Sequence, residues 1–257
     1  MTLSYIVSGF AVGLLVGMTG VGGGSLMTPL LTLLFGVPPS VAVGTDLAFA
    51  SITKSAGTLT HRLRGTIRWD IVKRLCMGAL PAAVVSTLAL KSFGTLSPEI
   101  GQIIRYSIAA SVLLTVVALI FKGRMLAWIN AHPEKQLQGN KLAAATIIAG
   151  AVLGVLVTVS SIGAGAIGAT LLVMLYPRMS SAEVAGTDIA YAVPLTAIAA
   201  LGHWWLGSIH WELLASLLVG SLPGITLGSW VARSVPEKFL RVLLAMTLTG
   251  VAVKLIY

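Results

Sequence analysis

Two Gly-Thr-Asp triplets place an aspartate, Asp46 and Asp188, inside otherwise apolar segments of this chain. An ionisable side chain at membrane depth is costly and suggests a functional site by default. Such a carboxylate could carry a proton or bind a cation. Each triplet also lies near the expected start of a helix, where the carboxylate could instead act as an N-cap for free backbone N–H groups. Both interpretations are open from the sequence.

Three further titratable residues, Lys54, His61 and His203, accompany the aspartates. Lys54 lies within an apolar stretch and could neutralise an anionic substrate, or its ammonium could extend to the nearby cytoplasmic face. The histidines could shuttle protons, although their places at expected helix ends favour capping. No set of His, Cys or carboxylate residues has the spacing of metal ligands, so neither a metal nor a cofactor is expected.

Runs of small residues interrupt two apolar segments, 3–37 and 142–176, that are too long for one crossing of about 20 residues. Non-helical backbone at membrane depth is tolerated only where it is buried or lines a cavity. A helix that begins there points N–H groups and a positive dipole end at the cavity, which favours anions. Alternatively, the glycines only allow close helix contact.

We therefore predict an anion site at the two helix breaks, with Lys54 as an added positive charge. The candidate binding residues are Thr19, Gly20, Gly22, Gly23, Gly24 and Ser25 at the first break and Ser160, Ser161, Gly163 and Gly165 at the second.

The composition indicates that membrane helices position these residues. The 257 residues are 56% hydrophobic and 10% charged, and the mean hydropathy is +0.95. Soluble domains carry about 25% charged residues, so we predict an all-α polytopic membrane protein. The net charge of +9 does not indicate nucleic-acid binding, because Lys and Arg lie between the apolar segments instead of along one face. The apolar stretches are 3–37, 41–60, 71–91, 100–121, 142–176, 183–203, 213–232 and 239–257.

An internal repeat relates the two halves of the chain. From Gly44 onward, the first triplet, His61 and the Gly-Thr-Ile-Arg-Trp stretch at 65–69 recur at a constant offset of 142 residues. Such a register indicates duplication. We predict repeat one over 1–121, a cytoplasmic connector over 122–141 and repeat two over 142–257, within one membrane domain over 1–257.

The charge pattern predicts that the halves are inverted. Residues 54–74 hold six Lys and Arg, whereas the matched stretch 196–216 holds none, so the positive-inside rule places them on opposite sides. Each half then has three ordinary helices, and its glycine-split segment returns to the side on which it starts. The connector is assigned to the cytoplasm, with a short interfacial helix around 125–129 followed by a loop.

Taken together, these motifs resemble the TauE/SafE family, the group of 4-toluene sulfonate uptake permeases. The resembling stretches cover nearly the whole chain and are residues 13–31, 44–57, 61–70 and the mirrored set at 163–223. The resemblance implies a permease of the bacterial inner membrane, built from inverted repeats. It also implies a small anionic substrate such as sulfite or an organosulfonate.

The expected function is secondary transport of this anion across the lipid bilayer by alternating access. Asp46, Asp188, His61 and His203 are the candidates for coupling to protons. The chain has no phosphate-binding loop for ATP and no paired catalytic signature, so an enzyme is not expected. A passive anion channel is the main alternative, followed by an intramembrane enzyme or a scaffold without transport.

Overall fold

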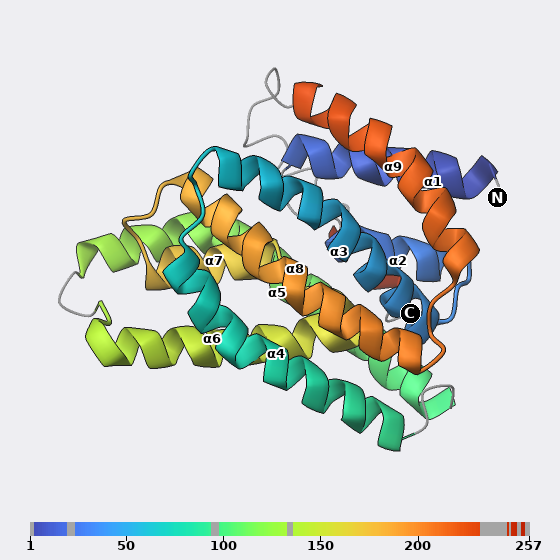
Figure 1. Ribbon diagram of the computed structural model, residues 1–257, viewed down its shortest axis with the longest axis horizontal. Coiled ribbons are helices and arrows are strands. Elements are labelled where there is room, and N and C mark those ends of the chain that lie inside the picture. The colour runs from blue at the N-terminus through green and yellow to red at the C-terminus, as the bar shows by residue number, and fades with distance from the viewer. Residues whose placement is uncertain are drawn as a thin grey trace.

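The computed structural model describes residues 3–19, 24–93, 98–132, 136–231, 246, 248–250 and 253–254, and within them the chain is all-α (Figure 1). The helices are α1 (Leu3–Thr19), α2 (Gly24–Leu34), α3 (Pro39–Leu63), α4 (Trp69–Ser92), α5 (Pro98–Ala131), α6 (Gly139–Ser160), α7 (Ala166–Leu175), α8 (Ser181–Trp205) and α9 (Trp211–Val231).

Length and apolar composition make five helices of the described chain able to cross a membrane, as a bilayer core of about 30 Å requires. These spans are Trp69–Ser92, Ile100–Ile129, Gly139–Ser160, Ser181–Trp205 and Trp211–Gly228. The helix α3 is equally long but carries Asp46, Lys54 and Arg62. The predicted all-α membrane fold is therefore confirmed.

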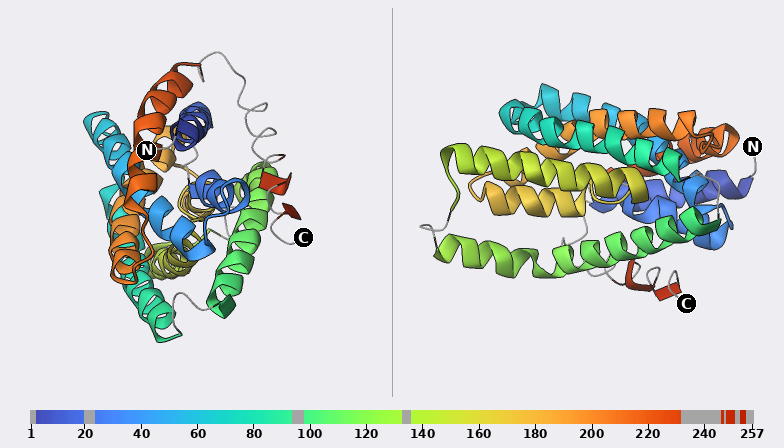
Figure 2. Two further views of the ribbon diagram at one scale, coloured as in Figure 1. Left: turned by 90° about the vertical axis from the view of Figure 1, so that its right-hand side faces the viewer. Right: turned by 90° about the horizontal axis from the view of Figure 1, so that it is seen from below.

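The long helices form two outer layers around shorter ones. Figures 1 and 2 show α3, α4, α8 and α9 on one face and α5 along the opposite face. The short helices α2 and α7 lie between these layers, and Ala166 at the start of α7 is buried. This arrangement encloses the break between α6 and α7, where Ser161, Ile162 and Ala164 are buried.

The closest helix pairs join one half of the chain to the other. The helix α1 packs along α9, α4 packs along α6, and α3 packs along α8. Small residues permit this proximity, since a Cβ added at Gly9 would lie 2.5 Å from the Leu217 carbonyl oxygen. Gly150 meets the carbonyl of Leu75 in the same way. These glycines form the small-residue packing faces that their spacing predicts.

The helix boundaries keep the register of the repeat. The helices α2, α3 and α4 begin at residues 24, 39 and 69, and α7, α8 and α9 begin 142 residues later, at 166, 181 and 211. The helices α3 and α8 are antiparallel: Gly44 near the start of α3 lies against His203 near the end of α8, and Gly186 lies against His61. Inverted halves require such a pairing, although their sidedness in the membrane stays a prediction.

The start of the connector differs from the expectation of a separate interfacial helix. Residues 122–131 continue α5 without a break, so this helix has 34 residues and reaches Ala131. The stretch contains Lys, Arg, Met, Leu and Ala, which are good helix formers, and no proline. It therefore extends α5 beyond the apolar stretch at 100–121.

The packing around individual glycines predicts that alanine substitutions at different glycines change the stability of the protein by different amounts. A Cβ at Gly78 would overlap the backbone of Ile147 on α6, and backbone cannot move aside as a flexible side chain can. We expect Gly78→Ala to lower the midpoint of thermal unfolding in detergent by separating α4 from α6. Gly123→Ala is the control, because a Cβ there meets no atom within 4 Å and alanine favours the helix by about 1 kcal/mol. Equal midpoints for the two variants would contradict the proposed contact.

Candidate functional site

Lys54 is buried in the centre of α3 and contacts the second helix break. Its side chain is 7% exposed, and Nζ donates a hydrogen bond to the carbonyl oxygen of Ala164 at 3.1 Å. Ala164 belongs to the segment between α6 and α7. The ammonium therefore does not extend to the membrane surface, which was the alternative left open by the sequence.

Asp46 lies eight residues before Lys54 on α3, roughly 12 Å away along the helix axis at 1.5 Å per residue. Its Oδ2 accepts a hydrogen bond of 2.6 Å from the hydroxyl of Thr28 on α2. Its Oδ1 has no hydrogen-bond partner among the described residues, nor does the hydroxyl of Ser161, which lies beside this carboxylate. Asp46 is thus a buried acid that contacts elements of both halves.

Asp188 occupies the matched position on α8 and is 4% exposed. Its carboxylate lies beside the backbone N–H of Gly165, the last residue before α7. Gly168 makes room for it, since a Cβ there would overlap Asp188 Oδ1 and lie 2.7 Å from the hydroxyl of Tyr191. Asp188 Oδ1 and the Tyr191 hydroxyl have no hydrogen-bond partner within the described chain.

The N-cap interpretation of both aspartates is wrong. The N-cap of α3 is Pro38, and that of α8 is Ser180, whose side chain accepts from the N–H of Glu183 in a capping box. Asp46 and Asp188 follow two turns later, where the backbone N–H groups are already bonded within the helix. Their carboxylates are therefore free for another role.

Electrostatic attraction joins these three buried residues, with the ammonium of Lys54 interacting with the carboxylates of Asp188 and Asp46. A buried charge is tolerated only when it is paired or hydrogen-bonded. One ammonium faces two carboxylates, so the group carries one excess negative charge when all three residues are ionised. We call Asp46, Lys54 and Asp188 the central charge group.

The second break has a backbone that depends on glycine. The helix α6 ends at Ser160, Ser161 is left-handed with φ of 60°, and Gly163 and Gly165 have φ of 136° and 135°. L-residues rarely adopt these values, so the glycines permit the break. The Ser160 hydroxyl contacts Ile162 N at 3.2 Å and Ser111 Oγ at 3.1 Å, and it stabilises the break itself.

The first break is described only at its edges. The helix α1 ends at Thr19, and α2 begins with Gly24 and Ser25. Gly20, Gly22 and Gly23 lie outside the described residues, as do the side chains of Thr19 and Ser25.

Each of the two histidines contacts a group outside the central charge group. His61 Nδ1 and the hydroxyl of Thr66 are 2.8 Å apart at the end of α3. His203 is buried, and its Nε2 is 3.0 Å from the carbonyl oxygen of Thr158 in the last turn of α6. Both positions agree with roles at helix ends.

The threonines of the Gly-Thr-Asp triplets have a role that the sequence interpretation missed. Thr45 Oγ1 accepts a hydrogen bond of 3.1 Å from the N–H of His210, and Thr187 Oγ1 accepts one of 3.1 Å from the N–H of Arg68. Each threonine thereby bonds to the backbone of the other half, directly before its helix α4 or α9 begins. This exchange explains why the triplet recurs together with the later Gly-[Thr/Ser]-Ile-x-Trp motif.

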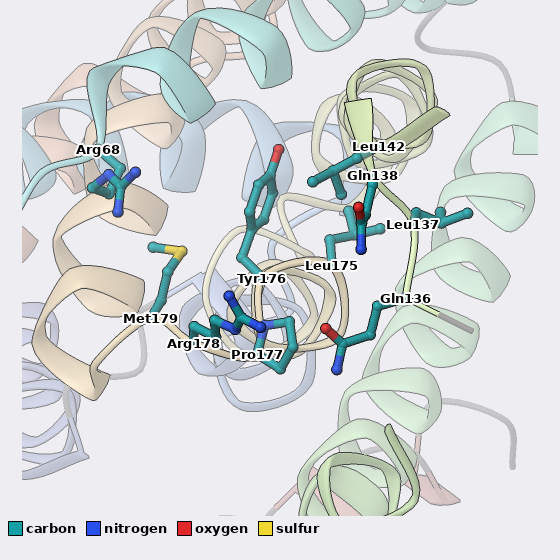
Figure 3. A pocket seen from close by; sticks show the side chains of 10 residues that line it. All are labelled: Arg68, Gln136, Leu137, Gln138, Leu142, Leu175, Tyr176, Pro177, Arg178 and Met179. Atoms are coloured by element: carbon teal, nitrogen blue, oxygen red, sulfur yellow. The ribbon is translucent and has the colours of Figure 1, made fainter. Parts of the chain in front are cut away.

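Two cavities lie on either side of the turn between α7 and α8. The larger, of about 380 Å³, has Arg68 and Arg178 on one side and Gln136 and Gln138 on the other, with Tyr176 between them (Figure 3). The second, of about 280 Å³, lies between α5, α7 and α8, and Asp188 is among the residues that line it. Both are lined by Pro177 and Met179. No cluster of metal-ligating side chains occurs in the part of the chain that the structure describes.

Comparison with known proteins agrees with the motifs and the geometry. The family model described as sulfite exporter TauE/SafE matches residues 5–255. The probable membrane transporter protein YjnA of Bacillus subtilis is 34% identical over 256 residues, covering 100% of each chain. A second Bacillus subtilis relative, the probable membrane transporter protein YdhB, is 27% identical over 244 residues, covering 93% of each chain.

A probable membrane transporter protein of Xylella fastidiosa is 26% identical over 260 residues, covering 98% of this chain and 94% of its own. No solved structure matches the chain at a significant level. The match to the family model and the 34% identity extend over nearly the entire sequence. The chain therefore belongs to the TauE/SafE family and is a multi-pass bacterial membrane transporter.

Proposed function

We propose that the protein is a secondary transporter of a small anion, sulfite or an organosulfonate or a related sulfur compound, and that it couples this transport to protons. The observation that carries the proposal is the contact of buried Lys54 with the Ala164 carbonyl at the helix break, where two buried carboxylates attract the ammonium. A cation enclosed at such a break is a binding partner for an anion. Transport proceeds by alternating access between the two halves as inverted repeats.

The proposed substrate position is next to the Lys54 ammonium, at the end of α7 that begins with Ala166. An anion there takes the place of the Ala164 carbonyl as a partner of the ammonium. It also faces the positive end of the α7 dipole and the N–H groups of its first turn, which favour negative charge. The unpaired hydroxyl of Ser161 supplies a further donor.

The charges of the central charge group argue for protons as the coupling ion. When both aspartates are ionised, the central charge group already has one excess negative charge. An arriving anionic substrate is then repelled strongly in this low-dielectric interior. A proton on either carboxylate removes the excess. The anion and the proton are therefore expected to bind together, which distinguishes a coupled carrier from a passive channel.

Uptake into proteoliposomes tests this function. We expect radiolabelled sulfite to accumulate when an inward proton gradient is imposed, and sulfoacetate and thiosulfate are run as competitors. Asp188→Asn should remove the stimulation by the gradient, because a carboxamide carries no exchangeable acidic proton. Asp70→Asn is the control, since Asp70 is exposed and only loosely paired with Arg68 at 3.6 Å.

Two outcomes would contradict the proposal in different ways. Rapid wild-type flux that ignores the gradient would indicate a passive anion channel. Absence of uptake for every anion in any gradient would refute the assigned class of substrate.

A further inference from the structure

The cavity of about 280 Å³ between α5, α7 and α8 is lined by one member of the central charge group, Asp188. Gly165 also lines it, as do Lys122 and Leu126 of α5. Lys122 and Asp188 attract each other electrostatically across this space. A water molecule takes roughly 30 Å³ of the liquid, so the cavity has room for a small hydrated anion.

In the described part of the first half, larger side chains occupy the positions that match this cavity. Ala169, Val173 and Ala185 line the cavity or adjoin it on α7 and α8, and their counterparts 142 residues earlier are Met27, Leu31 and Val43. The three counterparts are larger and fully buried, at 0% exposure. The two halves therefore differ: in the second half Asp188 lines a cavity, whereas in the first half Asp46 is 0% exposed.

Basic residues identify the side of the membrane at which this cavity opens. Lys122 lines it, and Arg68 and Arg178 line the adjoining cavity across the turn at 177–179 (Figure 3). By the positive-inside rule, a surface with these side chains faces the cytoplasm.

We propose that this cavity is the cytoplasmic access path to the central charge group, and that Lys122 is the residue at which an arriving anion first binds. The inference rests on the proposed function for the identity of the ligand, an oxyanion. It assigns the structure to an inward-open state, in which Met27, Leu31 and Val43 close the matched path of the first half. Lys122 also raises the local concentration of anions at the path, as a positively charged cleft does.

Cysteine labelling tests the access path without any substrate. In a Cys76→Ser background, Ala169→Cys and Ala185→Cys are exposed to a negatively charged, membrane-impermeant methanethiosulfonate reagent in inside-out vesicles. We expect both to react much faster than Met27→Cys and Val43→Cys, the matched positions. Labelling after denaturation checks that each thiol is intact. Equal rates at matched positions, or faster labelling of Ala169→Cys from the outer face, would overturn the access path.

Transport kinetics test Lys122 itself. We expect Lys122→Gln to raise the half-saturating anion concentration at the cytoplasmic side about tenfold, the lower end of the effect of electrostatic focusing. Lys122→Arg should preserve the wild-type value because it retains the charge. Lys141→Gln removes an exposed lysine that does not line the cavity and is the control. An unchanged value for Lys122→Gln would refute its role.

The two experiments separate this inference from the proposed function. If the anion is assigned wrongly, transport fails in every variant, but the labelling contrast between matched positions remains. If the path is assigned wrongly, the labelling contrast disappears while wild-type transport persists.

Discussion

Replacing Lys54 by glutamine is expected to abolish gradient-driven transport and to destabilise the protein. The substitution removes the ammonium that donates to the Ala164 carbonyl and that attracts Asp46 and Asp188. Removing a buried cation leaves the carboxylates that it attracts less well compensated, which is destabilising in a low-dielectric interior. We expect a clear fall in the midpoint of thermal unfolding in detergent, and uptake of sulfite at background level.

A second substitution distinguishes charge balance from simple loss of packing. Lys54→Gln combined with Asp188→Asn removes one carboxylate along with the ammonium, so the unfolding midpoint should recover in part while transport stays lost. The deficit of the single variant should also shrink as the pH is lowered, because protonation neutralises the carboxylates that have lost their partner. Transport or stability of wild-type level in Lys54→Gln would exclude the central charge group as the site.

Thr196 provides a matched control for Lys54 in the other half. It lies 142 residues later on α8, and its hydroxyl donates to the carbonyl of Ala192 in its own helix at 2.8 Å. Thr196→Val removes this neutral hydrogen bond, which contributes about 1 kcal/mol. We expect it to reduce stability slightly, without the dependence on pH that characterises Lys54→Gln.

The second large effect is expected for Gly168→Ala. A Cβ at this position overlaps Asp188 Oδ1 and lies 2.7 Å from Tyr191 Oη, so the carboxylate must move from the N–H of Gly165. A hydrogen bond to a charged group contributes about 1.5–3 kcal/mol, equivalent to roughly a 10- to 100-fold change in an equilibrium constant. We expect proton-driven uptake to fall by that factor.

The control for Gly168→Ala is Gly57→Ala, on the facing side of α3. A Cβ at Gly57 makes ordinary contact with the side chain of Ile189, the residue after Asp188, at 3.5 Å and overlaps no atom. It should transport close to the wild-type rate. If both variants transport normally, the Asp188 carboxylate tolerates displacement, and its assigned position in the mechanism is wrong.

Residue types and short spacings in the sequence predict the helix ends and breaks, because these depend on residues close together in the chain. The break between α6 and α7 follows from Gly163 and Gly165, because the φ values required there exclude most other residues. The sequence also contained a signal that was missed: Ser180 and Glu183 have the spacing of a capping box. It places the start of α8 two turns before Asp188 and decides against that residue as the N-cap.

The site itself depends on contacts between distant parts of the chain. Lys54 and Ala164 are 110 residues apart, and no periodicity or propensity links them. The same holds for the hydrogen bond between Thr45 and the backbone of His210. A repeat in sequence predicts that the two halves resemble each other, but the pairing of α1 with α9 is a property of the assembled structure.

That pairing has a consequence for the order in which the protein is made. The helix α1 ends at Thr19, and the helix along which it packs begins at Trp211, so α1 is synthesised well before its partner. Until α9 emerges from the ribosome, the glycine face of α1 must be covered by lipid or by the insertion machinery. Chains truncated before α9 are therefore expected to expose this face, and membrane quality-control proteases should degrade them faster than the 257-residue chain.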